Sequence, residues 1–104
     1  MNRSREGAIA EGLLGSKGRI RVLQVLAESG ELNVTEVARR TGMNYTSVER
    51  HLERLKGMGL VREKRYGKIR ILEVAFQSIT VRFEKGQRLE VETSPPTRIS
   101  GSTK

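Results

Sequence analysis

Apolar side chains recur at helical spacing in two adjacent segments near the middle of the chain, which predicts two amphipathic helices. Asn33 and Asn44 precede these segments, and asparagine is a favoured helix N-cap. Gly42 lies between them and can end the first helix in the left-handed conformation. A helix, a short turn containing glycine and a second helix are typical of a helix-turn-helix. The apolar positions are Val34, Val37, Ala38 and Thr41 in the first segment and Val48, Leu52 and Leu55 in the second.

The pattern then changes from helical to alternating, which predicts a β-hairpin over about residues 60–72 with its turn at residues 66–68. Ile69 and Ile71 alternate with Arg70 in the return strand. A basic hairpin beside a helix-turn-helix is a wing, which can lie along a phosphate backbone while the second helix enters a major groove. The cations of this hairpin are Arg62, Lys64, Arg65, Lys68 and Arg70.

Residues 16–29 predict a further helix, capped by Ser16 and stopped by Gly30, and Glu31 and Leu32 predict a short strand that pairs with the wing. A helix that is apolar on two sides is usually buried on two sides. We expect one side to meet the second helix of the helix-turn-helix and the other to meet the N-terminal arm or a second protomer. The first side carries Ile20, Leu23 and Ala27, and the second carries Val22 and Val25.

The flanking segments complete the predicted organisation. Residues 1–13 form an N-terminal arm whose glycines disfavour a free helix, and residues 14–75 form the DNA-binding domain. Residues 76–93 form a C-terminal hairpin or dimerisation element. Alternation of Ile79, Val81 and Phe83 with polar residues favours the hairpin, with a helix over residues 76–84 as the alternative. Residues 94–104, rich in Ser, Thr and Gly, are expected to be disordered.

Charge narrows the class of function. The chain of 104 residues has 20 Lys and Arg against 12 acidic residues, a net charge of +8, which indicates a nucleic-acid partner. An acidic protein or a membrane surface is the alternative partner. A small core favours a homodimer. No signal peptide or apolar run of about 20 residues is present, so we expect a cytoplasmic protein.

No catalytic constellation is visible, so we expect no enzymatic activity. The chain has no Cys and one His, too few soft ligands for a metal site, and we expect no cofactor. His51 lies at the flank of the apolar stripe of the second helix, where a packing role is the more common one.

Residues 14–72 resemble the winged helix-turn-helix regulators of the ArsR-like type that are common in archaea. The match rests on the pattern Ser-Val-x-x-His-Leu-x-x-Leu-x-x-x-Gly-Leu-Val over residues 47–61. The resemblance implies an α+β fold, a three-helix core plus a β-hairpin wing, in which the second helix of the helix-turn-helix is the recognition helix. Metal-sensing members carry a Cys pair where residues 32–35 read Leu-Asn-Val-Thr, so metal sensing is not expected.

These features predict a sequence-specific, dimeric regulator that binds double-stranded DNA. Arg50 and Arg54 are four residues apart, and an anionic partner would relieve their repulsion, although a solvated face is the alternative. A chromatin-type protein with little sequence preference and a protein-interaction adaptor are the competing functions. Asn44, Thr46, Ser47 and Arg50 are expected at base edges, Tyr45 at the rim of the helix N-terminus, Arg54, Arg65, Lys68 and Arg70 on phosphates, and Tyr66 near the wing tip.

Overall fold

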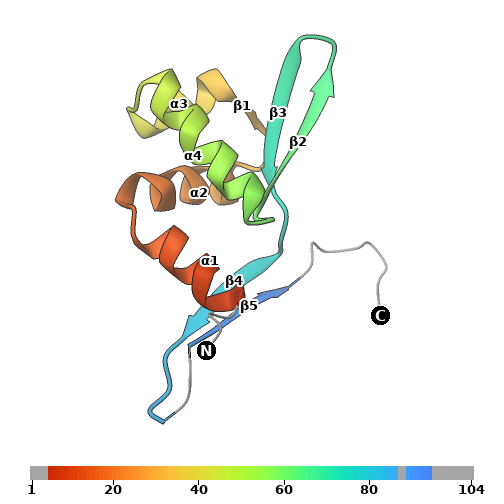
Figure 1. Cartoon of the computed structure of the whole chain (residues 1–104). Coiled ribbons are helices and arrows are strands. Elements are labelled where there is room, and N and C mark those ends of the chain that lie inside the picture. Colours follow the sequence, from red (N-terminus) through yellow and green to blue (C-terminus); the bar gives the residue numbers. More distant parts are fainter. Residues whose placement is uncertain (1–4, 87–88, 95–104) are drawn as a thin grey trace, which may run out of the picture.

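The computed structural model describes residues 5–86 and 89–94. The predicted disordered segment lies, from residue 95 on, outside these residues. Four helices and two antiparallel β-hairpins make up the described part (Figure 1). Their order is α1 (Arg5–Leu14), α2 (Lys17–Ser29), β1 (Leu32–Asn33), α3 (Val34–Thr41), α4 (Tyr45–Gly57), β2 (Val61–Tyr66), β3 (Ile69–Val74), β4 (Ser78–Arg82) and β5 (Glu90–Ser94).

The helix-turn-helix consists of α3 and α4, and its ends follow the predicted capping residues. Asn33 Oδ1 accepts a hydrogen bond of 2.8 Å from the backbone N–H of Glu36. Asn44 Oδ1 likewise accepts a hydrogen bond of 2.8 Å from the backbone N–H of Ser47. Gly42 ends α3 with φ of 74°, a conformation that residues with a Cβ rarely adopt. The predicted helix boundaries are therefore confirmed.

The core lies where α2, α3, α4 and β3 meet. Its fully buried side chains form a continuous apolar cluster, as expected for a small domain with one core. The predicted stripe of α4 is confirmed, since each of its three apolar residues is fully buried. The largest fully buried side chains are Leu26, Leu52, Leu55, Leu72, Val22, Val37 and Val48.

The two sides of α2 are corrected by the structure. Val22, which we expected to face the N-terminal arm or a second protomer, is 0% exposed inside this protomer, whereas Ile20 is 37% exposed. Leu26 explains the difference, because Val22, Leu23 and Leu26 form a stripe at helical spacing that turns toward α4. Two overlapping stripes fit this sequence, and periodicity alone does not decide which one faces inward.

A three-stranded antiparallel sheet in the order β1-β3-β2 builds the wing, residues 61–74. Leu32 pairs with Leu72 and Asn33 with Ile71, so the short predicted strand exists, one residue further along the chain than expected. Val61 pairs with Val74 at the base of the hairpin, and Tyr66 pairs with Ile69 next to the turn. The winged helix-turn-helix, an α+β fold, is thus formed as predicted.

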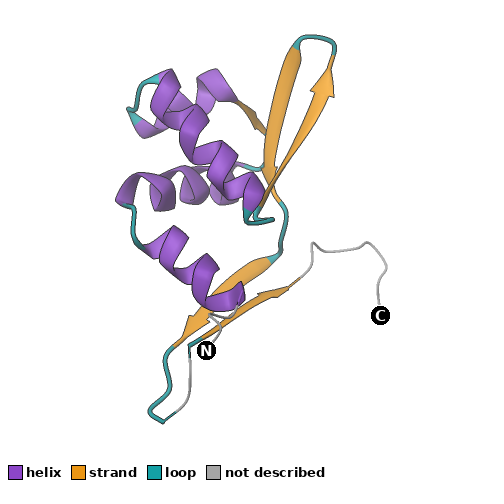
Figure 2. Cartoon of the chain, viewed as in Figure 1, coloured by secondary structure: helices purple, strands orange, loops and turns teal. Residues whose placement is uncertain are grey.

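The C-terminal hairpin, β4 and β5, pairs in register from Ser78 with Ser94 to Arg82 with Glu90. The alternative of a helix over residues 76–84 is wrong. Figure 2 shows that the wing and this hairpin extend toward opposite ends of the molecule. Val91 of β5 is buried, and α1 lies against β5 and α2.

Within the predicted N-terminal arm, the described residues from Arg5 on form a regular helix, α1, despite their glycines, which is more order than the sequence predicts. Ala10 and Leu13 of α1 are buried against the rest of the protomer. Gly12 permits close packing, since a Cβ at this position would lie 3.3 Å from the Cε of Met58. Tertiary packing therefore outweighs the low helix propensity of glycine here.

Candidate nucleic-acid interface

The recognition helix presents one polar face to solvent, because its apolar stripe is fully buried. Asn44, Tyr45, Thr46 and Arg50 are exposed, and Ser47 is half-buried. The Oδ1 of Asn44 is already used in capping α4, so its amide NH₂ is the remaining donor for an outside group. The structure therefore brings the predicted base-edge residues together on one exposed helix end.

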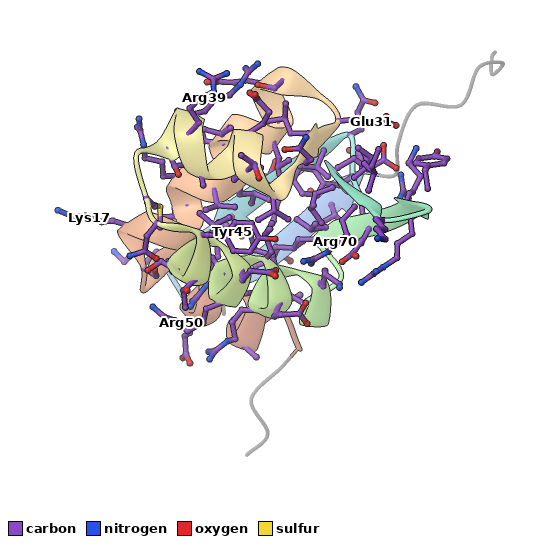
Figure 3. The ribbon with its side chains drawn as sticks, turned by 90° about the horizontal axis from the view of Figure 1, so that it is seen from above. Lys17, Glu31, Arg39, Tyr45, Arg50 and Arg70 are labelled. Carbon is purple, nitrogen blue, oxygen red and sulfur yellow. The ribbon has the colours of Figure 1, made fainter. Side chains whose placement is uncertain are left out.

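Arg50 carries an uncompensated charge on this face. It forms no ion pair with any residue of the described ranges, 5–86 and 89–94. Arg50 also lines the groove between α4 and the wing, together with Arg65 and Arg70, and its side chain is labelled in Figure 3. A free guanidinium beside the exposed end of a helix is available to a bidentate acceptor such as a guanine edge or a phosphate.

The wing tip adds a second cationic surface. Arg65, Tyr66 and Lys68 are exposed, although Arg65 Nε also lies 3.2 Å from Glu63 Oε2. Lys68 and Tyr45 line one shallow groove of about 210 Å³ between the wing and the starts of α3 and α4. The predicted wing residues and the predicted recognition helix therefore share a single surface.

Arg70 does not extend from this surface as expected. Its Nη1 lies 2.7 Å from Glu49 Oε2, and its Nε lies 2.8 Å from Glu63 Oε2. These two carboxylates, Glu49 first, hold the pKa of Arg70 above its ordinary value. Within the protein the charge of Arg70 is balanced by these two carboxylates, and the expectation that Arg70 holds a phosphate stays a prediction.

Arg19, at the start of α2, lies beside the cations of α4, a position that the sequence did not predict. It donates a hydrogen bond to the carbonyl oxygen of Gly12. Burial lowers its pKa first, and the nearby positive charges of Arg54 and Arg50 lower it further. Three guanidinium groups thus gather where α2 crosses α4. The basic composition of α2 was visible, but no sequence pattern places residue 19 beside residues 50 and 54.

His51 lies at the same crossing. A Cβ at Gly18 would stand 2.7 Å from its Nε2, so a larger residue at position 18 would displace the imidazole ring. Burial lowers the pKa of His51 first, and the positive charges of Arg19 and Arg50 lower it further, which favours the neutral imidazole. This environment agrees with the packing role predicted for His51.

Features of metal-binding and membrane-spanning proteins do not accompany this surface in the described residues. No cluster of three or more His, Cys, Asp or Glu residues that could hold a metal ion is present among them. None of the helices in residues 5–86 and 89–94 combines the length and apolar character that a membrane-spanning segment needs.

Comparison with known proteins points to one family. Residues 16–63 match the family profile described as bacterial regulatory protein, arsR family. No curated protein sequence matches the chain.

Solved structures extend the match. A crystal structure of a fragment (residues 1–100) of a protein from Mycobacterium bovis, described as a possible transcriptional regulatory protein, is 34% identical to this chain. The match covers 67% of this chain and 74% of that one, with a TM-score of 0.60. An NMR structure of a homodimeric winged helix-turn-helix DNA-binding domain from M. bovis, described as a possible ArsR-family transcriptional regulator, is 31% identical over 71% of this chain and 73% of that one, with a TM-score of 0.55.

A third structure is the antimony-specific transcriptional repressor AntR. It is 31% identical over 64% of this chain and 60% of its own length, with a TM-score of 0.59. Together with the capped helix-turn-helix, the basic wing and the exposed Arg50 of α4, these matches identify the class of protein. The chain belongs to the arsR family of bacterial regulatory proteins and is a winged helix-turn-helix, DNA-binding transcriptional regulator.

Proposed function

We propose that this protein binds specific sequences of double-stranded DNA as a homodimer, with α4 in the major groove and the wing on the phosphate backbone. The observation that carries the proposal is the uncompensated Arg50 on the exposed face of α4, which lines the groove between α4 and the wing together with Arg65. The unit that makes these contacts is residues 14–75. We also propose that the protein has no enzymatic activity, needs no cofactor and acts in the cytoplasm. Archaeal origin stays a prediction.

Base recognition is assigned to the start of α4. Arg50 can donate two hydrogen bonds to a guanine, Asn44, Thr46 and Ser47 can contact neighbouring base edges, and the ring of Tyr45 can stack on a sugar or touch a thymine methyl group. The helix presents these side chains without disturbing its core, because the buried stripe of α4 lies on its opposite face.

Phosphate contacts are assigned to both sides of the helix. A major groove is about 12 Å wide, so a helix inside it is flanked by two phosphate backbones. Arg65, Tyr66 and Lys68 of the wing would contact one backbone, and Arg54 with Arg19 would contact the other.

The deciding experiment replaces Arg50 by Ala and measures binding to a duplex selected by the wild-type protein from a random library and to a scrambled duplex. Fold stability should stay within about 0.5 kcal/mol, since Arg50 is exposed. Affinity for the selected duplex should fall by roughly 1–3 kcal/mol per half-site, with a smaller loss on the scrambled one. Equal losses on both duplexes would make Arg50 a phosphate clamp and favour the chromatin-type protein.

The homodimer is proposed to form on a groove of about 350 Å³ beside α1 and α2. Its lining is almost entirely apolar, and Leu14 and Ile20 are exposed there, which is the kind of surface that protein partners cover. The M. bovis domain described above is homodimeric, which supports a second copy as the partner. The lining residues are Leu13, Leu14, Ile20, Leu23, Gln24, Ala27, Phe76 and Ile79.

Sedimentation tests this assignment. Ile20→Glu places a charge in the groove and should yield a folded monomer at a concentration where the wild type is a dimer. Lys17→Glu, on the same helix but outside the groove lining, is the matched control and should remain a dimer. A dimeric Ile20→Glu variant would move the interface elsewhere.

A further inference from the structure

Four charged side chains connect the recognition helix to the wing. Arg70 of β3 bridges Glu49 of α4, at 2.7 Å and 3.0 Å, and Glu63 of β2, at 2.8 Å and 3.2 Å. Lys56, in the last turn of α4, closes the network with a contact of 2.8 Å to Glu63. The guanidinium of Arg70 therefore makes two hydrogen bonds to each of two carboxylates that belong to different elements.

The centre of this network is more shielded from water than the other ion pairs of the wing, whereas Glu49 and Lys56 at its two ends are each 31% exposed. The side chain of Glu63 is 8% exposed and that of Arg70 is 18% exposed. Ion pairs of this kind are screened less by salt and solvent than exposed ones, and the bidentate geometry of Arg fixes their orientation. Arg70 and Lys56 hold the pKa of Glu63 at about 2, in agreement with a carboxylate that stays charged.

The position of the network matters because the wing is a two-stranded ribbon over most of its length. The third strand, β1, pairs with β3 only at Leu72 and Ile71, so the ribbon beyond Ile71 has no third strand. Isolated two-stranded ribbons are marginally stable and twist easily. Arg70 lies directly beyond that point and joins the ribbon to the middle of α4.

We propose that Glu49 and Arg70 are positioning residues for DNA binding, which fix the wing at the angle to α4 that a duplex requires. The inference rests on the docking mode proposed above, in which wing and recognition helix contact the same duplex. An interface held in its bound geometry before association loses less entropy on binding, which raises affinity without any contact to the ligand. Glu49 and Arg70 then act on DNA through the wing, and Lys68 and its neighbours make the contacts.

The positioning role and electrostatics alone predict opposite changes in DNA affinity when the charge of Glu49 is removed. Glu49 borders the groove between α4 and the wing, so removing its negative charge should strengthen binding to polyanionic DNA if charge were the only effect. A positioning role predicts the opposite, because Glu49→Gln removes a bidentate partner of Arg70 and releases the wing. The affinity of this variant therefore separates the two roles.

The experiment compares Glu49→Gln with Glu53→Gln by fluorescence anisotropy on a duplex selected by the wild-type protein. Glu53 lies one turn further along α4 and is 62% exposed, with a single ion pair to Lys56 at 3.2 Å. Both variants lose the same charge, and thermal unfolding checks that both remain folded. We expect Glu49→Gln to weaken binding, by roughly fivefold or more as is typical of coupled sites. Glu53→Gln should bind as tightly as the wild type or more tightly. A Glu49→Gln variant that gains affinity as Glu53→Gln does would overturn the proposal.

A second measurement does not depend on DNA. The chain has no Cys, so Thr35→Cys on α3 and Tyr66→Cys at the wing tip give two unique sites for spin labels. The distance distribution between the labels should be narrow in the otherwise wild-type protein and broad after Glu49→Gln. Identical distributions would overturn the positioning role. A wild-type protein that binds no duplex would instead refute the proposed docking, with the label distances still testing how the wing is held.

Discussion

The two β-hairpins of this protein have similar lengths and the same antiparallel pairing, yet their side chains differ in kind. The wing, residues 61–74, has five cationic and two acidic residues, whereas the C-terminal hairpin, residues 78–94, has three of each. The wing is joined to α4 through ion pairs, and the C-terminal hairpin packs on α1 through buried Val91 and half-buried Ile79. The two hairpins therefore differ in the charge that they carry outside the core and in how each is joined to the helices.

Each hairpin also differs along its own length. In the wing, Val61 and Leu72 near the base are buried, whereas Tyr66 and Ile69 next to the turn are exposed. The C-terminal hairpin keeps Val91 buried, and Phe83, just beyond β4, is 73% exposed. Exposed apolar or aromatic side chains therefore lie away from the base of each hairpin, at Tyr66 and Ile69 in the wing and at Phe83 after β4.

The largest expected effect is the salt dependence of DNA binding. If the wing and the recognition helix of a dimer neutralise on the order of 6–10 phosphates, affinity should fall roughly 10³–10⁵-fold between 50 and 200 mM salt. The measurement is a titration of labelled duplex across a salt series. An almost flat dependence would mean that the charge contrast between the hairpins has no role in DNA binding, and it would favour the adaptor function.

Substitutions at the base of the wing and at the end of the C-terminal hairpin should differ in their effect on the free energy of unfolding. Leu72→Ala empties a fully buried position and should cost about 2–5 kcal/mol in the free energy of unfolding. Phe83→Ala removes a larger but exposed side chain and should change stability by about 0.5 kcal/mol or less. Urea unfolding of both variants measures the difference. Equal losses would show that Phe83 is covered in solution.

Acid should weaken the wing before it weakens the C-terminal hairpin. The pKa of Glu63 is lowered to about 2, chiefly by Arg70, so its stabilisation is complete above the ordinary pKa near 4.5 and is lost as pH falls toward 2. The ionised Glu63 carboxylate contributes on the order of 2 kcal/mol to the free energy of unfolding. Glu63→Gln should abolish this part of the pH dependence in acid unfolding followed by circular dichroism. Glu92→Gln is the control, since its carboxylate lies 4.0 Å from Arg82 and is exposed; it should unfold as the wild type does.

The smallest effect compares one cation from each hairpin. Lys68→Ala should weaken binding to all duplexes about equally and lower the slope of log affinity against log salt by about 1 for each phosphate that Lys68 neutralises. Arg82→Ala removes the same charge from β4, where Glu90 lies within 3.5 Å, and should leave the slope unchanged. A matching decrease in both variants would mean that the C-terminal hairpin also contacts DNA.

Local features of the fold were predictable from the sequence, whereas pairings between distant side chains were not. The caps at Asn33 and Asn44 and the turn at Gly42 depend on neighbouring residues, and all three are confirmed. Arg70 was assigned to a phosphate because alternation shows only which strand face it occupies. Its partner Glu49 is 21 residues away, and the sequence does not reveal whether a cation meets a carboxylate or DNA.

The orientation of α2, both its buried face and its crossing with α4, was the other feature that the sequence did not predict. Two apolar stripes overlap on α2, and the buried one was identified only when Val22 was found inside the core. For the candidate site, the exposed end of α4 and the wing tip were predicted from periodicity and charge. Arg19 was not, because its position near Arg50 and Arg54 depends on how α2 crosses α4.

Asn33 occupies two structures at once, since it pairs with Ile71 in the wing sheet and its side chain caps α3. Breaking the sheet at this register therefore also exposes the first turn of the helix-turn-helix to water. Amide hydrogen exchange should report this as one cooperative opening, in which the N–H of Glu36 and the amides of the β1–β3 ladder exchange together. The wing base and the start of the helix-turn-helix then unfold as one unit, so neither can be lost without the other.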